Sequence, residues 1–161
     1  VTSRLEGSVD VKVLMSIREA KANAYFALSD FLNSHAESEC LLALARHTGD
    51  RVKEGAALAS MAFSSFWAHD FEKALEESRQ ALDVATQVDA APVIAASRFT
   101  NGYIYATTER LEAARIEWTE ALRIGRATAA PRPRTFRNHS PSVALRFRGT
   151  GQENTWRQPS K

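Results

Sequence analysis

The sequence contains four histidines, whose side chains could hold a metal ion or move a proton. Their separations match no common spacing of metal ligands; they stand at His35, His47, His69 and His139. The first three fall where we expect helices to end. We therefore predict that these three are exposed caps or turn residues rather than metal ligands or catalytic bases.

The other candidates for chemistry are a single cysteine and several neighbouring glutamates. Cys40 is alone, which excludes an intramolecular disulfide or a multi-cysteine metal site. No histidine stands three or four residues from it to hold a thiolate, so we expect buried or half-buried helix packing. Glu37, Glu39 and the Glu76-Glu77 pair are interpreted as solvated helix faces, because adjacent residues point apart on a helix.

The nearest approach to a phosphate-binding loop is Gly149-Thr150-Gly151, which follows no expected strand and precedes no expected helix. With these candidates set aside, the sequence predicts a protein that is not an enzyme. We expect no cofactor and no metal ion.

Composition favours one globular domain. The chain has 161 residues, of which 44% are hydrophobic and 25% are charged. Its longest stretch without a charge, Gly55 to His69, has 15 residues, and a membrane-spanning helix needs about 20. No signal-peptide pattern is visible. We therefore expect a cytoplasmic protein with no membrane partner.

Charge divides the chain into two regions. Residues 1–125 hold 13 Lys and Arg against 18 Asp and Glu, a net charge of −5. Residues 126–161 hold eight Lys and Arg and one acidic residue, Glu153, a net charge of +7, together with four of the five prolines. Such a composition buries too little apolar surface to offset chain entropy. The sequence therefore predicts a domain over 1–126 and a disordered basic tail over 127–161.

The body of the chain repeats itself every 40 residues. Residues 15–54 laid on 55–94 give eight identities without gaps, including the adjacent pair Asp30-Phe31 and Asp70-Phe71. A second shift matches residues 72–82 with 112–122 at Glu, Ala and Leu positions. Self-similarity at a fixed period is typical of stacked repeats. The alignment divides the body into units of about 15–54, 55–94 and 95–126.

Each unit has the pattern of two amphipathic helices. In the second unit we expect helices over 51–68 and from 71 onward, with apolar residues spaced by three and four. The third unit gives helices over 92–107 and 110–126. The first gives helices near 10–30 and 35–47, after which Gly49 relaxes the chain and Asp50 caps the next helix. The sequence thus predicts an all-α fold of six helices.

The units resemble tetratricopeptide repeats. The second unit carries the small and apolar positions of that pattern at Leu58, Met61, Ala62, Ser65, Phe71, Ala74, Ser78 and Ala81; the third carries them at Gly102, Tyr105, Leu111, Ala114, Trp118 and Ala121. Leu58 and Arg98 replace the first aromatic, the closing proline is missing, and the period is 40 rather than about 34. The long period is similar to the arrays of bacterial nucleotide cyclases and large ATP-dependent transcriptional regulators.

This resemblance implies a right-handed superhelical stack of antiparallel helix pairs whose first helices line a concave groove. The groove residues it implies are Asn23, Phe26, Ala59, Phe63, Phe66, Trp67, Phe99 and Tyr103. Aromatic rings framed by alanine suit a peptide or a helix of a partner. The expected function is a protein-interaction scaffold, although Phe66 and Phe99 also fit an inter-helix core.

Two other functions remain open. The chain could be a regulatory or sensor piece of a larger bacterial signalling protein. It could also bind nucleic acid through the arginines and aromatics of the tail, although basic tails without a recognisable module are seldom specific binders. The last helix pair also has no expected cap. We therefore predict partial exposure, and self-association through this pair, at Leu111, Trp118, Leu122 and Ile124.

Overall fold

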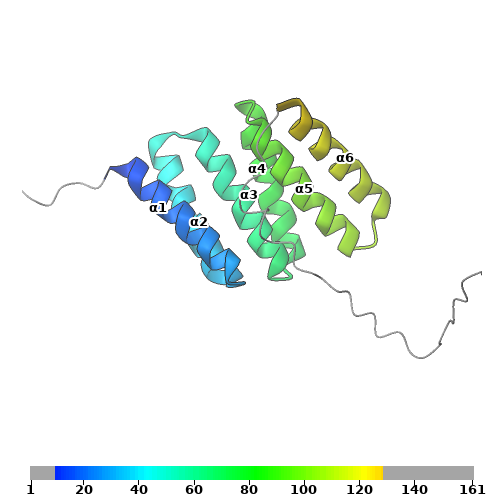
Figure 1. Ribbon diagram of the computed structural model, residues 1–161, viewed down its shortest axis with the longest axis horizontal. Coiled ribbons are helices and arrows are strands. Elements are labelled where there is room, and N and C mark those ends of the chain that lie inside the picture. The colour runs from blue at the N-terminus through cyan, green and yellow to red at the C-terminus, as the bar shows by residue number, and fades with distance from the viewer. Residues whose placement is uncertain (1–9, 129–161) are drawn as a thin grey trace, which may run out of the picture.

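The computed structural model describes residues 10–128, and this part of the chain folds into six α-helices without a strand (Figure 1). The helices are α1 Val11–Ala27, α2 Phe31–Thr48, α3 Arg51–Trp67, α4 Phe71–Gln87, α5 Ala91–Thr107 and α6 Leu111–Thr128. The predicted all-α class with six helices is confirmed. Apart from 127 and 128, which end α6, the basic tail lies outside the described residues.

The helices begin at regular intervals because their connections repeat the same backbone geometry. A residue with positive φ, between 52° and 70°, stands in each turn; these residues are Ser29, Gly49, His69, Asp89 and Glu109. The next residue donates its backbone N–H to the carbonyl five residues earlier, at 2.8–2.9 Å. This is the Schellman arrangement, which satisfies carbonyls left open at a helix end.

Aspartates start the first four helices. The side chains of Asp10, Asp30, Asp50 and Asp70 each accept a backbone N–H from two or three residues further on. The cap at Asp30 places the start of α2 at Phe31, four residues before the expected start at His35. The helix pairs therefore begin at 11, 51 and 91, with the same 40-residue offset that the sequence alignment has.

Each helix packs against the next one along the chain, and α3 also contacts α5. Small residues lie at the contacts inside each pair: Ala74 of α4 is fully buried, and so, almost completely, is Ala114 of α6. Close approach of two helices needs small side chains at the crossing. Figure 1 shows α6 at one end of the stack and α1 at the other, with the α1–α2, α3–α4 and α5–α6 turns along one edge.

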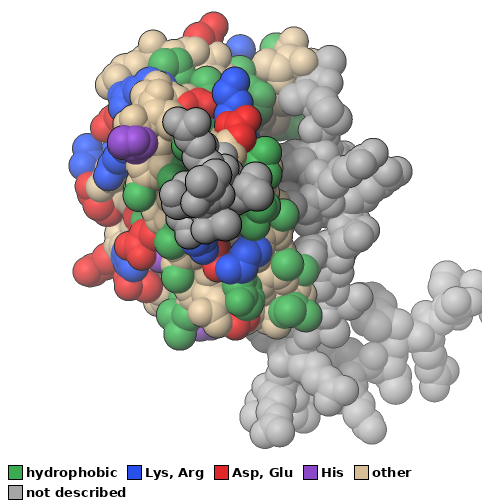
Figure 2. Space-filling model, turned by 90° about the vertical axis from the view of Figure 1, so that its left-hand side faces the viewer, with side chains coloured by type: hydrophobic (Ala, Val, Ile, Leu, Met, Phe, Trp, Pro, Cys, Tyr) green, Lys and Arg blue, Asp and Glu red, His purple; other side chains and the backbone are tan. Residues whose placement is uncertain are grey.

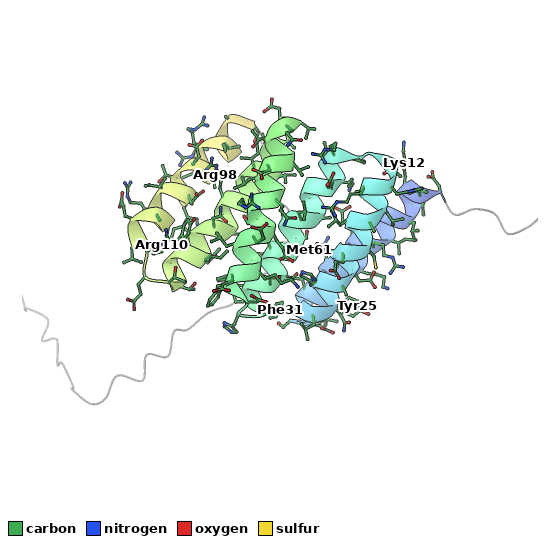
Figure 3. The ribbon with its side chains drawn as sticks, turned by 180° about the vertical axis from the view of Figure 1, so that it is seen from behind. Lys12, Tyr25, Phe31, Met61, Arg98 and Arg110 are labelled. Atoms are coloured by element: carbon green, nitrogen blue, oxygen red, sulfur yellow. The ribbon has the colours of Figure 1, made fainter. Side chains whose placement is uncertain are left out.

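The core has an aliphatic part and an aromatic part. The aliphatic part gathers side chains such as Leu41, Leu58 and Val84 from α1 to α5. The aromatic part is centred on Phe66, Ala74 and Ile104, with half-buried rings packed against them. Figure 3 shows Met61 near the middle of the stack and Phe31 near the edge that carries the α1–α2 turn. The aromatic part continues to the surface at this edge.

Candidate partner-binding surface

Nine aromatic side chains form one connected series across all three helix pairs. Each contacts at least one other, with ring centroids 4.9–6.2 Å apart. We call this series the aromatic row; its members are Phe26, Phe31, Phe63, Phe66, Trp67, Phe71, Phe99, Tyr103 and Trp118. Such pairs add about 0.5–1.5 kcal/mol each beyond the area they bury. The row therefore links α1 to α6 through ring contacts.

Six of the eight groove residues named from the sequence belong to the aromatic row. They are Phe26, Phe63, Phe66, Trp67, Phe99 and Tyr103. Of the other two, Asn23 is exposed on α1, three residues before Phe26, whereas Ala59 is buried in the aliphatic core. Ala59 therefore supports the helices rather than offering a contact to a partner.

Sequence reasoning did not place Phe31, Phe71 and Trp118 on this surface. Phe31 stacks against Trp67 across the first two helix pairs, with centroids 6.0 Å apart. Trp118 meets Tyr103 edge-on at 5.6 Å. The repeated Asp-Phe pair was a signal for the first two residues, because it places a ring one residue inside each second helix.

Most of the row is half-buried rather than enclosed. Phe66 is buried, Trp118 is 36% exposed, and the remaining rings are intermediate. Phe66 and Phe99 were expected either on the groove surface or in the core between helices. Phe66 lies in the core, whereas Phe99 is half-buried. Two shallow hollows of the described surface lie elsewhere, one on α1 and one beside the end of α6. Neither of these two hollows is lined by a member of the row.

Two polar features belong to the helices that carry the row. Lys53 of α3 pairs with Glu19 of α1, with Nζ and Oε2 2.6 Å apart, and so ties the first two helix pairs together. The indole Nε1 of Trp67 is buried and has no hydrogen-bond acceptor among the described residues. An unsatisfied buried N–H is costly, so the packing of the ring against its neighbours must offset this cost.

Exposed apolar side chains extend this surface at the α1–α2 turn. Leu28 and Leu32 are each 77% exposed, on either side of Phe31 in the turn region. Figure 2 looks at this end of the molecule, and green hydrophobic side chains lie among the charged ones along its lower edge. Leu32 follows Phe31 of the row directly in the sequence, and Leu28 precedes it by three residues.

The predicted environment of His35 is wrong. His35 lies inside α2 and is buried, and its Nε2 is 2.7 Å from Oε1 of Glu77 in α4. Ser65 of α3 donates its hydroxyl to the other carboxylate oxygen of Glu77, at 2.8 Å. Glu77 was expected in solvent and is instead the centre of a buried contact between three helices. His47 and His69 are exposed, as predicted.

This contact does not have the order that activates a serine. In a catalytic triad the histidine stands between the hydroxyl and the carboxylate, so that it takes the hydroxyl proton. Here the carboxylate of Glu77 stands between Ser65 and His35. The arrangement fixes helices to one another. No group of three or more potential metal-ligating side chains occurs among residues 10–128.

Glu37 was also expected in solvent and is buried. It accepts hydrogen bonds from Arg18, at 2.7 Å, and from Lys21. The Arg18 hydrogen bond, followed by that of Lys21, lowers the pKa of Glu37, and it raises the pKa of Arg18 in turn. Cys40 was expected to be buried or half-buried and is instead exposed on α2.

The Glu37 contact recurs 80 residues later. Arg98 of α5 donates to Glu117 of α6 at 3.0 Å, with the same 19-residue separation as Arg18 and Glu37. Figure 3 labels Arg98 between these two helices. In the middle pair the arginine position is Leu58, and the equivalent carboxylate, Glu77, binds Ser65 and His35 instead. The 40-residue repeat thus has a polar counterpart as well as an apolar one.

No helix in the described part of the chain has the length and hydrophobicity needed to cross a membrane. Comparison with protein-family models finds no match for this chain, and comparison with curated proteins finds none.

Proposed function

We propose that this protein is a non-catalytic interaction scaffold that binds a peptide or a helix of a partner protein along the aromatic row. The observation that carries the proposal is the continuity of the row over three helix pairs, with most of its rings half-buried. A partner laid across α1, α3 and α5 would contact a surface that bends little, because ring contacts connect its parts.

The chemistry of the row selects the kind of partner. Aromatic rings provide a large apolar area at low cost in conformational entropy, and they also attract cations over their faces. Asn23 and the Glu19–Lys53 pair offer polar contacts at the α1 side. The preferred segment would thus alternate apolar or aromatic anchors with basic or amide side chains, as extended and helical peptides do in grooves.

A selection from a displayed library of random peptides, with the full chain as bait, tests this proposal. Peptides that enrich would be measured by fluorescence anisotropy against three variants. Phe99→Ala removes a ring from the row, and Asn23→Arg adds bulk at an exposed position beside it. Ile116→Ala removes an exposed apolar side chain from α6 that is not part of the row.

We expect Phe99→Ala and Asn23→Arg to raise Kd by about tenfold or more, which corresponds to ~1.4 kcal/mol, and Ile116→Ala to leave Kd unchanged. Circular dichroism of each variant checks that the helices persist. Failure of any peptide to enrich, or equal binding by all three variants, would show that the row does not bind partners.

A further inference from the structure

The 33 residues that follow α6 combine two features that suit the aromatic row. Residues 129–161 hold seven Lys and Arg and one Glu, a net charge of +6, whereas residues 10–128 hold 13 Lys and Arg against 17 Asp and Glu, a net charge of −4. The two parts of the chain therefore attract each other electrostatically. This attraction is not specific to one face by itself.

The aromatic residues of the segment supply the specificity. Each of the three stands within two residues of an arginine: Phe136 lies between Arg134 and Arg137, Phe147 lies between Arg146 and Arg148, and Trp156 precedes Arg157. Aromatic–arginine pairs bind aromatic surfaces well, because rings stack on rings while guanidinium groups lie over ring faces or reach carboxylates. The segment thus holds three such pairs, and the aromatic row spans three helix pairs.

The segment begins close enough to reach the row. Because α6 runs back along α5, Thr128 lies near the start of α5. Thr128 and Ala91 line the same hollow. Phe99 stands eight residues beyond Ala91, or about 12 Å along the helix. Phe136 stands eight residues beyond Thr128, and an extended chain of that length spans about 26 Å. The first aromatic–arginine pair can therefore meet Phe99 without strain.

We infer that residues 129–161 bind in cis across the aromatic row and compete there with the partner peptide. The inference rests on the proposed function, because it concerns the same surface. A short linker gives such a segment a high effective concentration, so a weak contact suffices to regulate access.

Spin labelling of the full chain tests the contact directly. In a Cys40→Ser background, Ser142→Cys carries a nitroxide label, and amide intensities are compared before and after the label is reduced. We expect strong broadening at Asn23, Phe63 and Phe99. Amides on the outer faces of α2, α4 and α6, such as Ala36, Glu76 and Ile116, should keep their intensity.

The matched control replaces Phe136, Phe147 and Trp156 by serine in the labelled chain and leaves residues 10–128 unchanged. Broadening at the row should disappear in this variant. Equal broadening of both faces, no broadening, or the same pattern in the control would overturn the inference. A second control mixes isotope-labelled chain that carries no nitroxide with nitroxide-labelled chain that carries no isotope. Broadening in this mixture would also overturn the inference, because the contact would then be between copies.

Competition separates this inference from the proposed function. A library-selected peptide should bind the triple serine variant about tenfold more tightly than the unaltered chain. Peptide binding without broadening at the row would overturn the inference and leave the proposed function standing. Broadening without any enriched peptide would do the reverse. Two results together would overturn the inference and favour nucleic acid as the ligand of the segment. They are loss of the broadening at the row when a poly-dT oligonucleotide is added, and unchanged broadening in the triple serine variant.

Discussion

Helices α4 and α6 occupy the same place in successive repeats, yet one is enclosed and the other ends the stack. Ala74 and Ala114 are both buried, so the contact with the first helix of the same pair is kept. The face toward the following pair differs. Ser78 of α4 is fully buried and donates to the carbonyl of Ser97 in α5, whereas its counterpart on α6 is Trp118.

The indole of Trp118 packs onto α5, the first helix of the same pair. The indole donates to the carbonyl of Phe99 at 3.2 Å and lies over Gly102. A Cβ at residue 102 would be 2.2 Å from the indole nitrogen, so this ring position needs glycine. The middle pair has Ala62 and Ser78 at these positions. Small residues thus occupy these positions where another helix pair follows, whereas a matched glycine and tryptophan occupy them at the end of the stack.

The largest test of this comparison exchanges the two side chains. Ser78→Trp should destabilise the fold by about 3 kcal/mol or more, because the ring has no room between α4 and α5 and the bond to Ser97 is lost. Trp118→Ser should cost about 1 kcal/mol, since the ring is partly exposed. Urea unfolding measures both. Equal losses in the free energy of unfolding would mean that neighbouring helices surround positions 78 and 118 equally closely.

The next test concerns the carboxylates at equivalent positions of α4 and α6. Glu77→Ala leaves His35 and Ser65 without their buried acceptor and should cost about 2–3 kcal/mol. Glu117→Ala should cost about 1 kcal/mol or less, because Arg98 is a third exposed and can turn to solvent. Thermal unfolding followed by circular dichroism compares them. A larger loss for Glu117→Ala would contradict the assignment.

Exposure at the end of the stack predicts association. Leu122 is 53% exposed, while its counterpart Leu82 is half-buried. The expected partial cover of the last pair is confirmed at Leu111, Trp118, Leu122 and Ile124. We expect the chain to self-associate through this face, and Leu122→Lys to weaken association by about tenfold, or ~1.4 kcal/mol. Sedimentation over a range of concentrations gives the constants, with Ile116→Lys as the control.

A smaller effect is expected at the turns. Gly49 has φ of 70° with open space around its Cα, so Gly49→Ala should cost about 1 kcal/mol from backbone strain alone. Glu109, at the equivalent place before α6, has φ of 60° with a side chain already present. Glu109→Gly should therefore change stability by less than ~1 kcal/mol, and in the stabilising direction. Destabilisation by Glu109→Gly, or no loss of stability in Gly49→Ala, in urea unfolding would contradict this.

The smallest expected effect is a change of slope with pH. The hydrogen bond from Arg18, with that from Lys21, lowers the pKa of Glu37. A carboxyl with a lowered folded-state pKa stabilises the fold above its unfolded pKa, and this contribution is lost as pH falls through the folded value. Glu37→Gln should therefore flatten the acid-side decline in stability. Urea midpoints from neutral pH down to about pH 3 follow it; an unchanged slope would exclude the pair as a source.

The sequence by itself determined the number and type of the elements. Helix-forming residues, aspartate caps such as Asp50 and apolar spacing act within a few residues, so they are readable without knowledge of the fold. The 40-residue period also fixed which positions correspond. It even contained the start of α2, because Asp30-Phe31 repeats as Asp70-Phe71, although the expected helix began only near His35.

Only the tertiary structure decided which polar residues are buried. His35 and Glu77 meet because α2 and α4 both pack against α3, and no periodicity within one helix indicates a contact between residues 42 positions apart. The same holds for the exposure of Cys40 and for Trp118 on Gly102. Burial depends on whether a neighbouring repeat covers a face, and this is a property of the stack rather than of any one helix.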